Sequence, residues 1–177
     1  MKEVLSKNYY DHYLTYDKEV VEYFNDVGKT TNLTQYAYLK KDRFDESGFD
    51  IRKIGVEYLD TLNSIYKALG PGEDNKDALM SGEVLGIFED NKLAGFVGRH
   101  PEGCLGMLYV FEKYRRKGYG EALEKAKIND LLDRNQRVFE EVIEGNDIST
   151  SLQNKLGFSK GNKTIYWKIW LKIKRNI

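Results

Sequence analysis

The sequence contains one cysteine, two prolines and two histidines among its 177 residues. The single cysteine, Cys104, excludes an internal disulfide. No run of apolar residues is long enough to span a bilayer, and the first ten residues lack the apolar stretch of a signal peptide. We therefore expect a cytoplasmic protein that does not insert into a membrane.

Net charge is also lacking, because the 28 basic side chains of lysine and arginine equal the 28 acidic ones. A balanced chain has no overall field that favours nucleic acid or an anionic membrane, so neither partner is expected. No group of histidine, cysteine and carboxylates has the spacing of a metal site, and no metal is predicted. The lysine and aromatic alternation of Thr164–Lys174 favours a closing edge strand over a nucleic-acid or membrane patch.

The length predicts one domain, or one domain with an elaboration. A helix is expected over Asp17–Asn25, with Val20, Val21 and Phe24 inward, and a strand over Gln35–Leu39. The polar stretch Lys40–Gly48 separates this N-terminal extension, residues 1–48, from a domain over residues 49–177. The sequence leaves open whether the extension dimerises, covers a pocket or extends a sheet.

From Phe49 onward, the pattern predicts alternating strands and helices, which excludes all-α and all-β folds. The expected elements are a strand over Phe49–Ile54, a helix from Leu59 ended by Gly70, Pro71 and Gly72, a short helix over Lys76–Met80, a hairpin of Val84–Phe88 and Leu93–Val97, a strand over Cys104–Val110, a helix over Glu121–Asp133, a strand over Val138–Ile143 beside the Cys104 strand, a helix before Gly157, and the closing strand.

The junction between the Cys104–Val110 strand and the following helix has the features of a phosphate site. Three basic residues and two glycines stand there, as Arg115, Arg116, Lys117, Gly118, Tyr119 and Gly120. Glycine lets the backbone approach a ligand closely, and the free N–H groups of the first helical turn attract anions. The alternative is a turn in which glycine serves only to reverse the chain.

A second pattern runs from Asn146 to Phe158. Asn146 or Asp147 can cap a helix whose apolar face is Ile148, Leu152 and Leu156, and Gly157 can end it in the left-handed conformation with Phe158 packing back. Gly106, inside a strand, indicates either a bulge or close ligand approach, or else packing against a helix.

Together, these two patterns resemble the coenzyme A pyrophosphate loop and the second motif of the GNAT (GCN5-related N-acetyltransferase) superfamily. The resemblance covers about three quarters of the chain and implies an α+β GNAT fold, a mixed, mostly antiparallel twisted sheet with helices on both faces. It implies acetyl-CoA as cosubstrate, with Arg115, Arg116, Lys117, Gly118, Tyr119 and Gly120 on the diphosphate. It also implies that Tyr109 and Val110 contact the acyl arm through their backbone, that one of their amides polarises the thioester carbonyl, and that Asn146 touches the pantetheine amide.

The resemblance does not extend to the proton-transfer groups. Many members place a tyrosine, the proposed acid for the leaving thiolate, where this chain has Gln153, and Tyr109 is the alternative acid. The Cys104 strand lacks the early glutamate of the histone-modifying branch. The candidates for the base are His100, Glu102, Glu141 and Glu144, with a plain surface role as the alternative for His100, and Cys104 is expected to be a buried thiol.

We expect an N-acyltransferase that moves an acetyl group from acetyl-CoA to a primary amine by direct attack in a ternary complex. The acceptor would be a small molecule or a peptide entering from the side of the Leu59–Met80 helices, and a homodimer stays open. The alternative is a module that binds or senses coenzyme A without turnover. A nucleic-acid-binding domain is a third reading, which the balanced charge opposes.

Overall fold

The computed structural model describes residues 12–25, 28–46, 48–66 and 75–169. One eight-stranded sheet runs through this part of the chain in the order β1-β8-β2-β7-β6-β5-β4-β3. Its strands are β1 (His12–Thr15), β2 (Lys29–Tyr38), β3 (Asp50–Lys53), β4 (Leu85–Glu89), β5 (Lys92–Arg99), β6 (Leu105–Val110), β7 (Val138–Ile143) and β8 (Ser159–Ile169). All neighbouring strands are antiparallel except β6 and β7.

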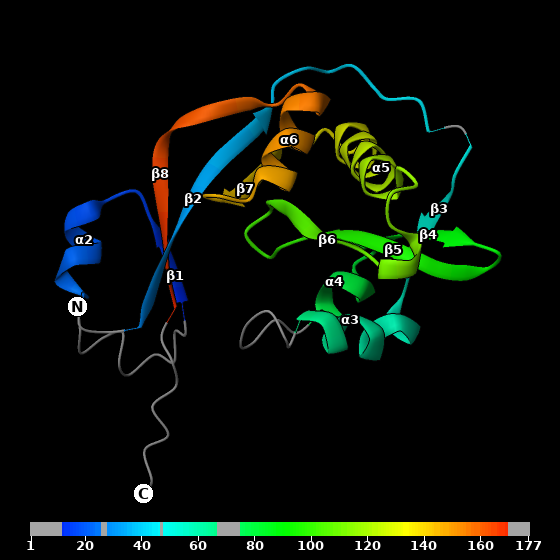
Figure 1. Ribbon diagram of the computed structural model, residues 1–177, viewed down its shortest axis with the longest axis horizontal. Coiled ribbons are helices and arrows are strands. Elements are labelled where there is room, and N and C mark those ends of the chain that lie inside the picture. The colour runs from blue at the N-terminus through cyan, green and yellow to red at the C-terminus, as the bar shows by residue number, and fades with distance from the viewer. Residues whose placement is uncertain (1–11, 26–27, 47, 67–74, 170–177) are drawn as a thin grey trace, which may run out of the picture.

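Helices cover both faces of the sheet, with α5 and α6 on one face and α3 and α4 on the other (Figure 1). The helices are α2 (Lys18–Tyr23), α3 (Leu59–Tyr66), α4 (Lys76–Met80), α5 (Tyr119–Asp133) and α6 (Asp147–Leu156), with 3₁₀ turns η1 (Val56–Tyr58) and η2 (Glu112–Tyr114). The expected α+β fold class is therefore confirmed. The predicted stop at Gly70, Pro71 and Gly72 lies outside the described residues.

Each face of the sheet has its own hydrophobic core. Under α5 and α6 the core includes the buried side chains of Leu105, Leu123, Val138 and Leu156. Under α3 and α4 the core is made by Ile54, Leu62, Leu79, Val84, Phe88, Phe96 and Met107. Because successive residues of a strand point to opposite faces, the side chains of β6 and β7 also alternate between these two cores.

Local sequence signals account for the ends of several elements. Asp17 caps α2, where its side chain accepts a hydrogen bond of 2.9 Å from the Glu19 N–H. Asp90 and Asn91 have positive φ in the turn between β4 and β5, as a two-residue hairpin turn requires. Gly157 ends α6 at φ +82°, and the Phe158 N–H donates to the Gln153 carbonyl.

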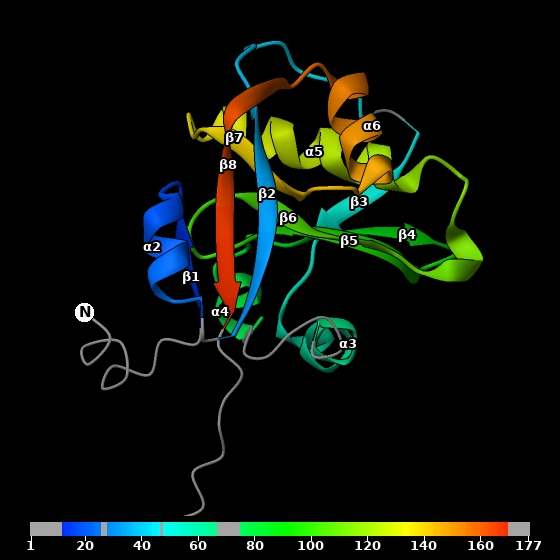
Figure 2. The same ribbon diagram turned by 60° about the vertical axis from the view of Figure 1, so that its left-hand side comes forward.

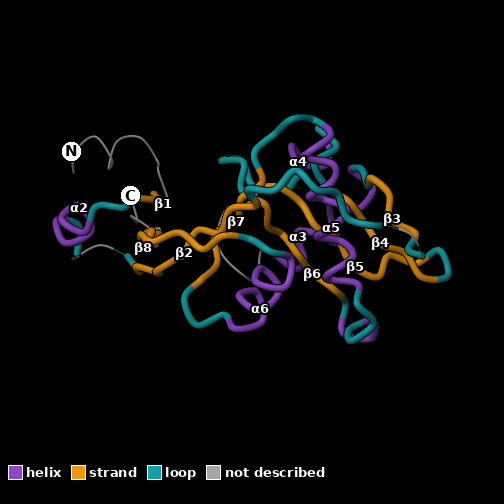
Figure 3. The backbone as a smooth tube through the Cα atoms, turned by 90° about the horizontal axis from the view of Figure 1, so that it is seen from above, coloured by secondary structure: helices purple, strands orange, loops and turns teal. Residues whose placement is uncertain are grey.

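The N-terminal segment extends the sheet. Strand β2 lies between β8 and β7, while β1 pairs with the end of β8. Figures 2 and 3 show β1, α2 and the adjoining ends of β2 and β8 at one end of the molecule, away from α5. Of the three roles left open by the sequence, extension of the sheet is the one observed in the described residues. The division into residues 1–48 and 49–177 stays a prediction.

Two expectations from the sequence are wrong. The closing strand is not an edge strand, because β8 is flanked by β1 and β2, and its Lys168 is 2% exposed with its ammonium donating to Thr30 Oγ1 at 3.1 Å. Beyond Ile169 the predicted strand lies outside the described residues. Ile148 is 85% exposed, so the apolar face of α6 consists of Leu152 and Leu156 only. None of the described helices is both long and apolar enough to cross a membrane.

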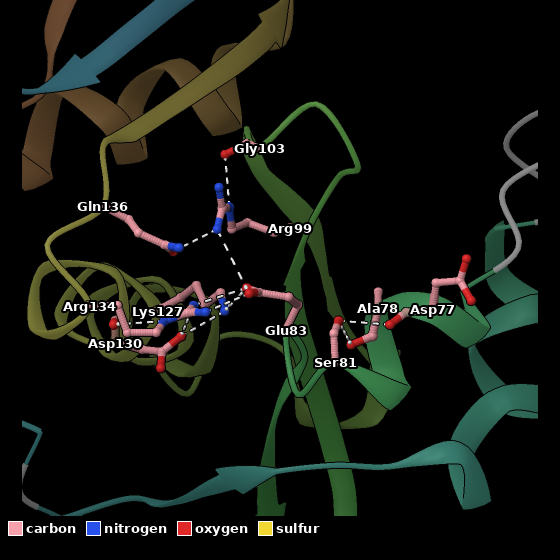
Figure 4. Close-up of polar contacts among 10 residues, drawn as sticks. All are labelled: Asp77, Ala78, Ser81, Glu83, Arg99, Gly103, Lys127, Asp130, Arg134 and Gln136. Carbon is pink, nitrogen blue, oxygen red and sulfur yellow. Dashed lines mark hydrogen bonds and ion pairs between the residues drawn. The ribbon is translucent and has the colours of Figure 1, made fainter.

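A buried ion-pair network fastens the end of α5 to the sheet (Figure 4). The Lys127 side chain, fully buried, lies 3.0 Å from Glu83 and 2.8 Å from Asp130. Arg134 bonds to the same two carboxylates at 2.5 Å and 2.6 Å. Arg99 at the end of β5 adds a hydrogen bond of 2.7 Å to Gln136. The network therefore ties the end of α5 and the segment after it to Glu83 before β4 and to the end of β5.

We expect replacement of Glu83 by glutamine to lower the free energy of unfolding by about 3 kcal/mol at pH 7. Hydrogen bonds from Arg134, with a smaller contribution from Lys127 and against the opposing effect of burial, lower the pKa of Glu83 from 4.5 to about 2. Each pKa unit corresponds to about 1.4 kcal/mol. A lowered carboxyl pKa stabilises the fold above pH 4.5, and this contribution is lost as the pH falls towards 2.

Urea unfolding at pH 7 and at pH 3 measures the effect. The difference in the free energy of unfolding between wild type and Glu83→Gln should be smaller at pH 3 than at pH 7. Glu22→Gln, which removes an exposed pair with Lys18 on α2, is the matched control and should change the free energy by less than about 0.5 kcal/mol. Equal stability of wild type and Glu83→Gln at pH 7 would contradict the assignment.

Candidate active site

Strands β6 and β7 meet at one point and then part. Their parallel pairing consists of Leu105 with Glu140, and beyond this pair β6 is bonded to β5 alone within the described residues. A bulge lies in the same stretch, where the β5–β6 register shifts between Phe96 and Gly98 and Met107 has φ +54°. Past Leu105, the β6 backbone therefore has no ladder partner on the β7 side within the described residues, and we call this break in the ladder the opening.

Gly106 lies at the start of this opening. A Cβ there would come within 2.4 Å of the imidazole Nε2 of His100, so the ring of His100 occupies the space that a side chain would need. Of the two expectations for Gly106, the structure shows the neighbouring bulge, and it shows that the close approach comes from His100. His100 is half-buried, and the choice between a base and a plain surface histidine stays a prediction.

The loop after β6 presents a row of free backbone N–H groups. Arg116 and Gly118 take positive φ values of 64° and 80°, and α5 begins at Tyr119 without a side-chain cap. The Arg115 N–H bonds to the Glu112 carbonyl and the Ala122 N–H to the Gly118 carbonyl. Between these two, the N–H groups of residues 116–121 have no acceptor among the described residues.

The two glycines leave space in front of these N–H groups. A Cβ on Gly118 would meet no atom within 4 Å, and one on Gly120 would make ordinary contacts of 3.9 Å with Val110 and 4.0 Å with Leu108. At Gly118 the positive φ explains glycine, but the packing of Gly120 does not require it. The packing around position 120 therefore gives no structural reason for glycine there.

The basic side chains of the loop are partly engaged by the protein itself. Lys117 bonds to both carboxylate oxygens of Glu89 at 2.9 Å and 2.8 Å, and the Tyr119 hydroxyl donates to the same carboxylate. The hydrogen bond from Lys117, followed by that from Tyr119, lowers the pKa of Glu89. Arg115 donates through Nε to the Val110 carbonyl at 3.1 Å. Main-chain N–H groups and the exposed Arg116 remain for an anion.

A cavity of about 180 Å³ lies beside Gly118, between the segment before β3 and helix α5. It offers both an aromatic ring and a cation next to the loop. Its lining residues are Asp45, Glu46, Phe49, Ile51, Gly118, Glu121, Ala122 and Lys125.

Tyr109 lies on the α3 and α4 side of the opening. Its ring stacks on Phe96 with centroids 5.9 Å apart and meets Phe111 edge-on at 5.3 Å. The guanidinium of Arg115 is 5.9 Å from the same ring. The side chain of Tyr109 is thus part of an aromatic wall, while its backbone belongs to the part of β6 that borders the opening.

Three of the polar side chains near the start of β6 lie close together. The potential donor atoms of Glu102, Cys104 and Glu141 are all within 4.8 Å of one another, although the first two come from the loop before β6 and the third from β7. Burial, and then the charge of Glu102, raise the pKa of Glu141, while His100 opposes the shift. Burial and the neighbouring carboxylates also raise the pKa of Cys104, which is therefore a thiol as expected.

The fourth base candidate, Glu144, lies apart from this group. Its carboxylate accepts hydrogen bonds from Asn32 at 3.2 Å and Thr164 at 3.5 Å on the exposed end of β7.

Helix α6 brings Asn146 and Gln153 to the other side of the opening. Asn146 is exposed, and its side-chain oxygen caps α6 by accepting from the Ser149 N–H at 3.2 Å. Gln153 is fully buried, with its amide donating to Glu124 of α5 at 2.6 Å. Glu124 also bonds to Glu140 of β7. The sequence reasoning missed both carboxyls, although Glu140 interrupts the inward series Val138, Glu140, Val142.

Comparisons with known proteins agree on the fold. Residues 84–167 match the family of FR47-like proteins. A Drosophila protein has 17% identity over 85% of this chain and 55% of its own, with a TM-score of 0.66. A GNAT-family protein from Novosphingobium aromaticivorans has 20% identity over 80% of this chain and 65% of its own, with a TM-score of 0.64. A GNAT-family acetyltransferase from Colwellia psychrerythraea has 13% identity over 89% of this chain and 64% of its own, with a TM-score of 0.62.

The chain thus spans less than two thirds of the length of these three structures, which bear on the fold alone. A search among curated proteins found no match. The parting of β6 and β7 and the glycine loop at the start of α5 agree with these comparisons: the chain has the GNAT fold, and its residues 84–167 match the FR47-like family.

Proposed function

We propose that the protein is an N-acyltransferase that takes an acyl group, most simply acetyl, from acyl-coenzyme A and transfers it to a primary amine. The observation that carries this proposal is the row of free N–H groups over residues 116–121, at the start of a 15-residue helix. Such a helix terminus favours a diphosphate through its donors and its dipole.

In this proposal, coenzyme A lies along the opening between β6 and β7. The loop of Arg115–Gly120 holds the diphosphate, and Phe49 and Lys125 beside Gly118 offer contacts to the rest of the nucleotide. The arm then runs along β6, where Tyr109 and Val110 supply backbone groups and Asn146 approaches from α6. An amide of β6 would stabilise the oxygen that gains charge when the thioester is attacked.

We assign the general base to Glu141 among the four candidates. It is half-buried near the start of β6, and its raised pKa brings it nearer to the range in which a carboxylate removes a proton usefully. Glu141 would take a proton from the acceptor ammonium, and the free amine would then attack the thioester carbon. Glu102 and His100 set the local charge. The acceptor would enter from the face of α3 and α4.

At the α6 position where the family resemblance implies a hydroxyl acid for the leaving thiolate, this chain has Gln153, a buried amide bonded to Glu124. A thiol of pKa about 8.5 leaves as the thiolate without much assistance, so transfer can proceed without a dedicated acid. Tyr109 remains the alternative donor from the opposite face. The same observation favours a second candidate function, a coenzyme A-binding or sensing module without turnover.

Two measurements test the proposal and separate the two functions. Calorimetry with acetyl-CoA should give binding, and its absence would refute both functions. A thiol-release assay over a panel of primary amines should give turnover above hydrolysis with at least one acceptor class, small amines or peptides. Tight binding without turnover on any member of the panel would replace the enzyme with the binding module.

A further inference from the structure

A buried polar cluster joins three elements behind the opening: Glu124 of α5, Glu140 of β7 and Gln153 of α6. The side chains of Glu124 and Gln153 are fully buried and that of Glu140 is 9% exposed. The Gln153 amide donates to Glu124 Oε1 at 2.6 Å, and the carboxyl groups of Glu124 and Glu140 are hydrogen-bonded to each other. The three elements are thus linked through one carboxyl, that of Glu124.

The hydrogen bond between the two carboxyl groups requires a proton. Two ionised carboxylates have acceptors only, and like charges at this distance in a desolvated site cannot both persist. Burial raises the pKa of both groups, and Glu124 adds to the rise at Glu140. Glu124 already accepts the Gln153 amide, which places the donated proton on Glu140, so the pair carries one shared proton.

The surroundings do not supply a compensating cation. Tyr36 of β2 stands opposite Glu140 in the sheet, and Leu105 of β6 pairs with Glu140 on the other side. Lys127, one turn further along α5, is bonded to Glu83 and Asp130 instead. The nearest thiol, Cys104, feels the charge of Glu140 but is un-ionised. No ion pair within the described residues includes Glu124 or Glu140.

Three atoms of the cluster are buried without a hydrogen-bond partner: Glu124 Oε2, Glu140 Oε2 and Gln153 Oε1. Each unsatisfied buried acceptor costs free energy, and this cluster contains three of them. Loss of the shared proton would add a second buried negative charge. The expected response to this second charge is separation of the three elements. Helix α6 contributes one side chain to the cluster, that of Gln153.

The place of the cluster links it to the site. Glu140 is the residue of the one β6–β7 pair, at the point where the opening begins. Gln153 lies on α6, whose first turn carries Asn146 at the helix cap. Any movement of α6 away from β7 therefore moves Asn146 relative to the opening.

We propose that Glu124, Glu140 and Gln153 are positioning residues that share one proton, and that this proton keeps α6 docked beside the opening so that Asn146 can meet the coenzyme A arm. The role in cofactor binding rests on the proposed function, whereas the shared proton does not. The proposal predicts that coenzyme A binding weakens when the cluster ionises, although no member of the cluster touches the diphosphate loop.

The shared proton is tested by thermal unfolding of wild type and Glu140→Gln between pH 4.5 and pH 9. A carboxyl pKa raised in the folded state means that the fold binds a proton which the unfolded chain has released, so wild type should lose stability as the pH rises above about 4.5. Glutamine donates to Glu124 without a titrating proton. Its Tm should equal or trail that of wild type at pH 4.5 and exceed it by at least about 3 °C at pH 8.

A constant difference in Tm across this pH range would overturn the shared proton. Glu140→Leu is the companion variant, since it removes both the proton and the hydrogen bond to Glu124, and it should be less stable than Glu140→Gln at every pH. If Glu140→Leu does not fold, the comparison of wild type with Glu140→Gln still decides the question.

Docking of α6 is tested by calorimetry with coenzyme A over the same pH range. Wild-type Kd should rise by up to about tenfold per pH unit once the pH exceeds the pKa of the pair, and Glu140→Gln should lack this rise. Equal pH profiles for the two proteins would overturn the positioning role. Absence of binding by wild type at every pH would overturn the proposed function and the positioning role together, while the unfolding data would still judge the shared proton.

Discussion

Replacement of Gly120 by glutamate should abolish coenzyme A binding, with a loss of affinity of at least about 100-fold. The new carboxylate would stand in the space in front of the free N–H groups of residues 116–121, where it accepts their hydrogen bonds and repels a diphosphate. Calorimetry with acetyl-CoA measures the loss. The fold should persist, because glutamate favours a helix more than glycine does and a Cβ at this position makes only ordinary contacts.

Two further variants separate charge from bulk at the same position. Gly120→Gln has the size of glutamate without its charge and should bind more tightly than Gly120→Glu, and Gly120→Ala should lose the least. Melting curves confirm that each variant is folded. If Gly120→Glu bound acetyl-CoA as wild type does, the loop would not be the diphosphate site.

Replacement of Glu141 by glutamine should lower the rate of acyl transfer by about 10² to 10⁴ while the Kd of acetyl-CoA stays unchanged. A glutamine keeps the size of the side chain but cannot take a proton from the acceptor, and loss of a general base has an effect of this order. The comparison of thiol release with calorimetry measures the two quantities separately. A parallel loss of affinity would indicate a structural role for Glu141 instead.

The pH dependence provides an independent check on this residue. Because burial raises the pKa of Glu141, the activity of wild type should rise with pH through a pKa above 4.5. Glu144→Gln is the matched control directly after the same strand, since Glu144 is exposed and bonded to Asn32 and Thr164. Its rate should equal that of wild type, and a large loss there would shift the base to the end of β7.

The fold was predictable where local chemistry sets the backbone. Alternating apolar residues, the hairpin that became β4 and β5, and the Gly157 stop each depend on a few neighbouring residues, and the structure has these elements where they were expected. The position of β8 depends on pairing with β1 and β2 across more than a hundred residues, and no local signal encodes that. Lys168 therefore read as an edge residue although it is buried.

The site shows the same division. The loop of Arg115–Gly120 was visible because glycine and basic residues follow a strand directly. The cluster of Glu102, Cys104 and Glu141 depends on contacts between segments far apart in the sequence, and so does the hydrogen bond between Gln153 and Glu124. No local pattern predicts such contacts. Only Glu140 carried a local sign, as a charged residue at an inward position of a strand. Sequence reasoning could name Gln153 as a departure from the family but not its partner.

Strands β6 and β7 pair only at Leu105 and Glu140, so the sheet consists of two four-stranded halves joined at this boundary. Helix α5 contacts strands of both halves and so connects them across the boundary between β6 and β7. Bending is therefore easiest along this line, where the backbone ladder offers least resistance. A ligand that binds between β6 and β7 would supply the missing hydrogen bonds and make the whole sheet more rigid, so its binding should slow amide hydrogen exchange in both halves.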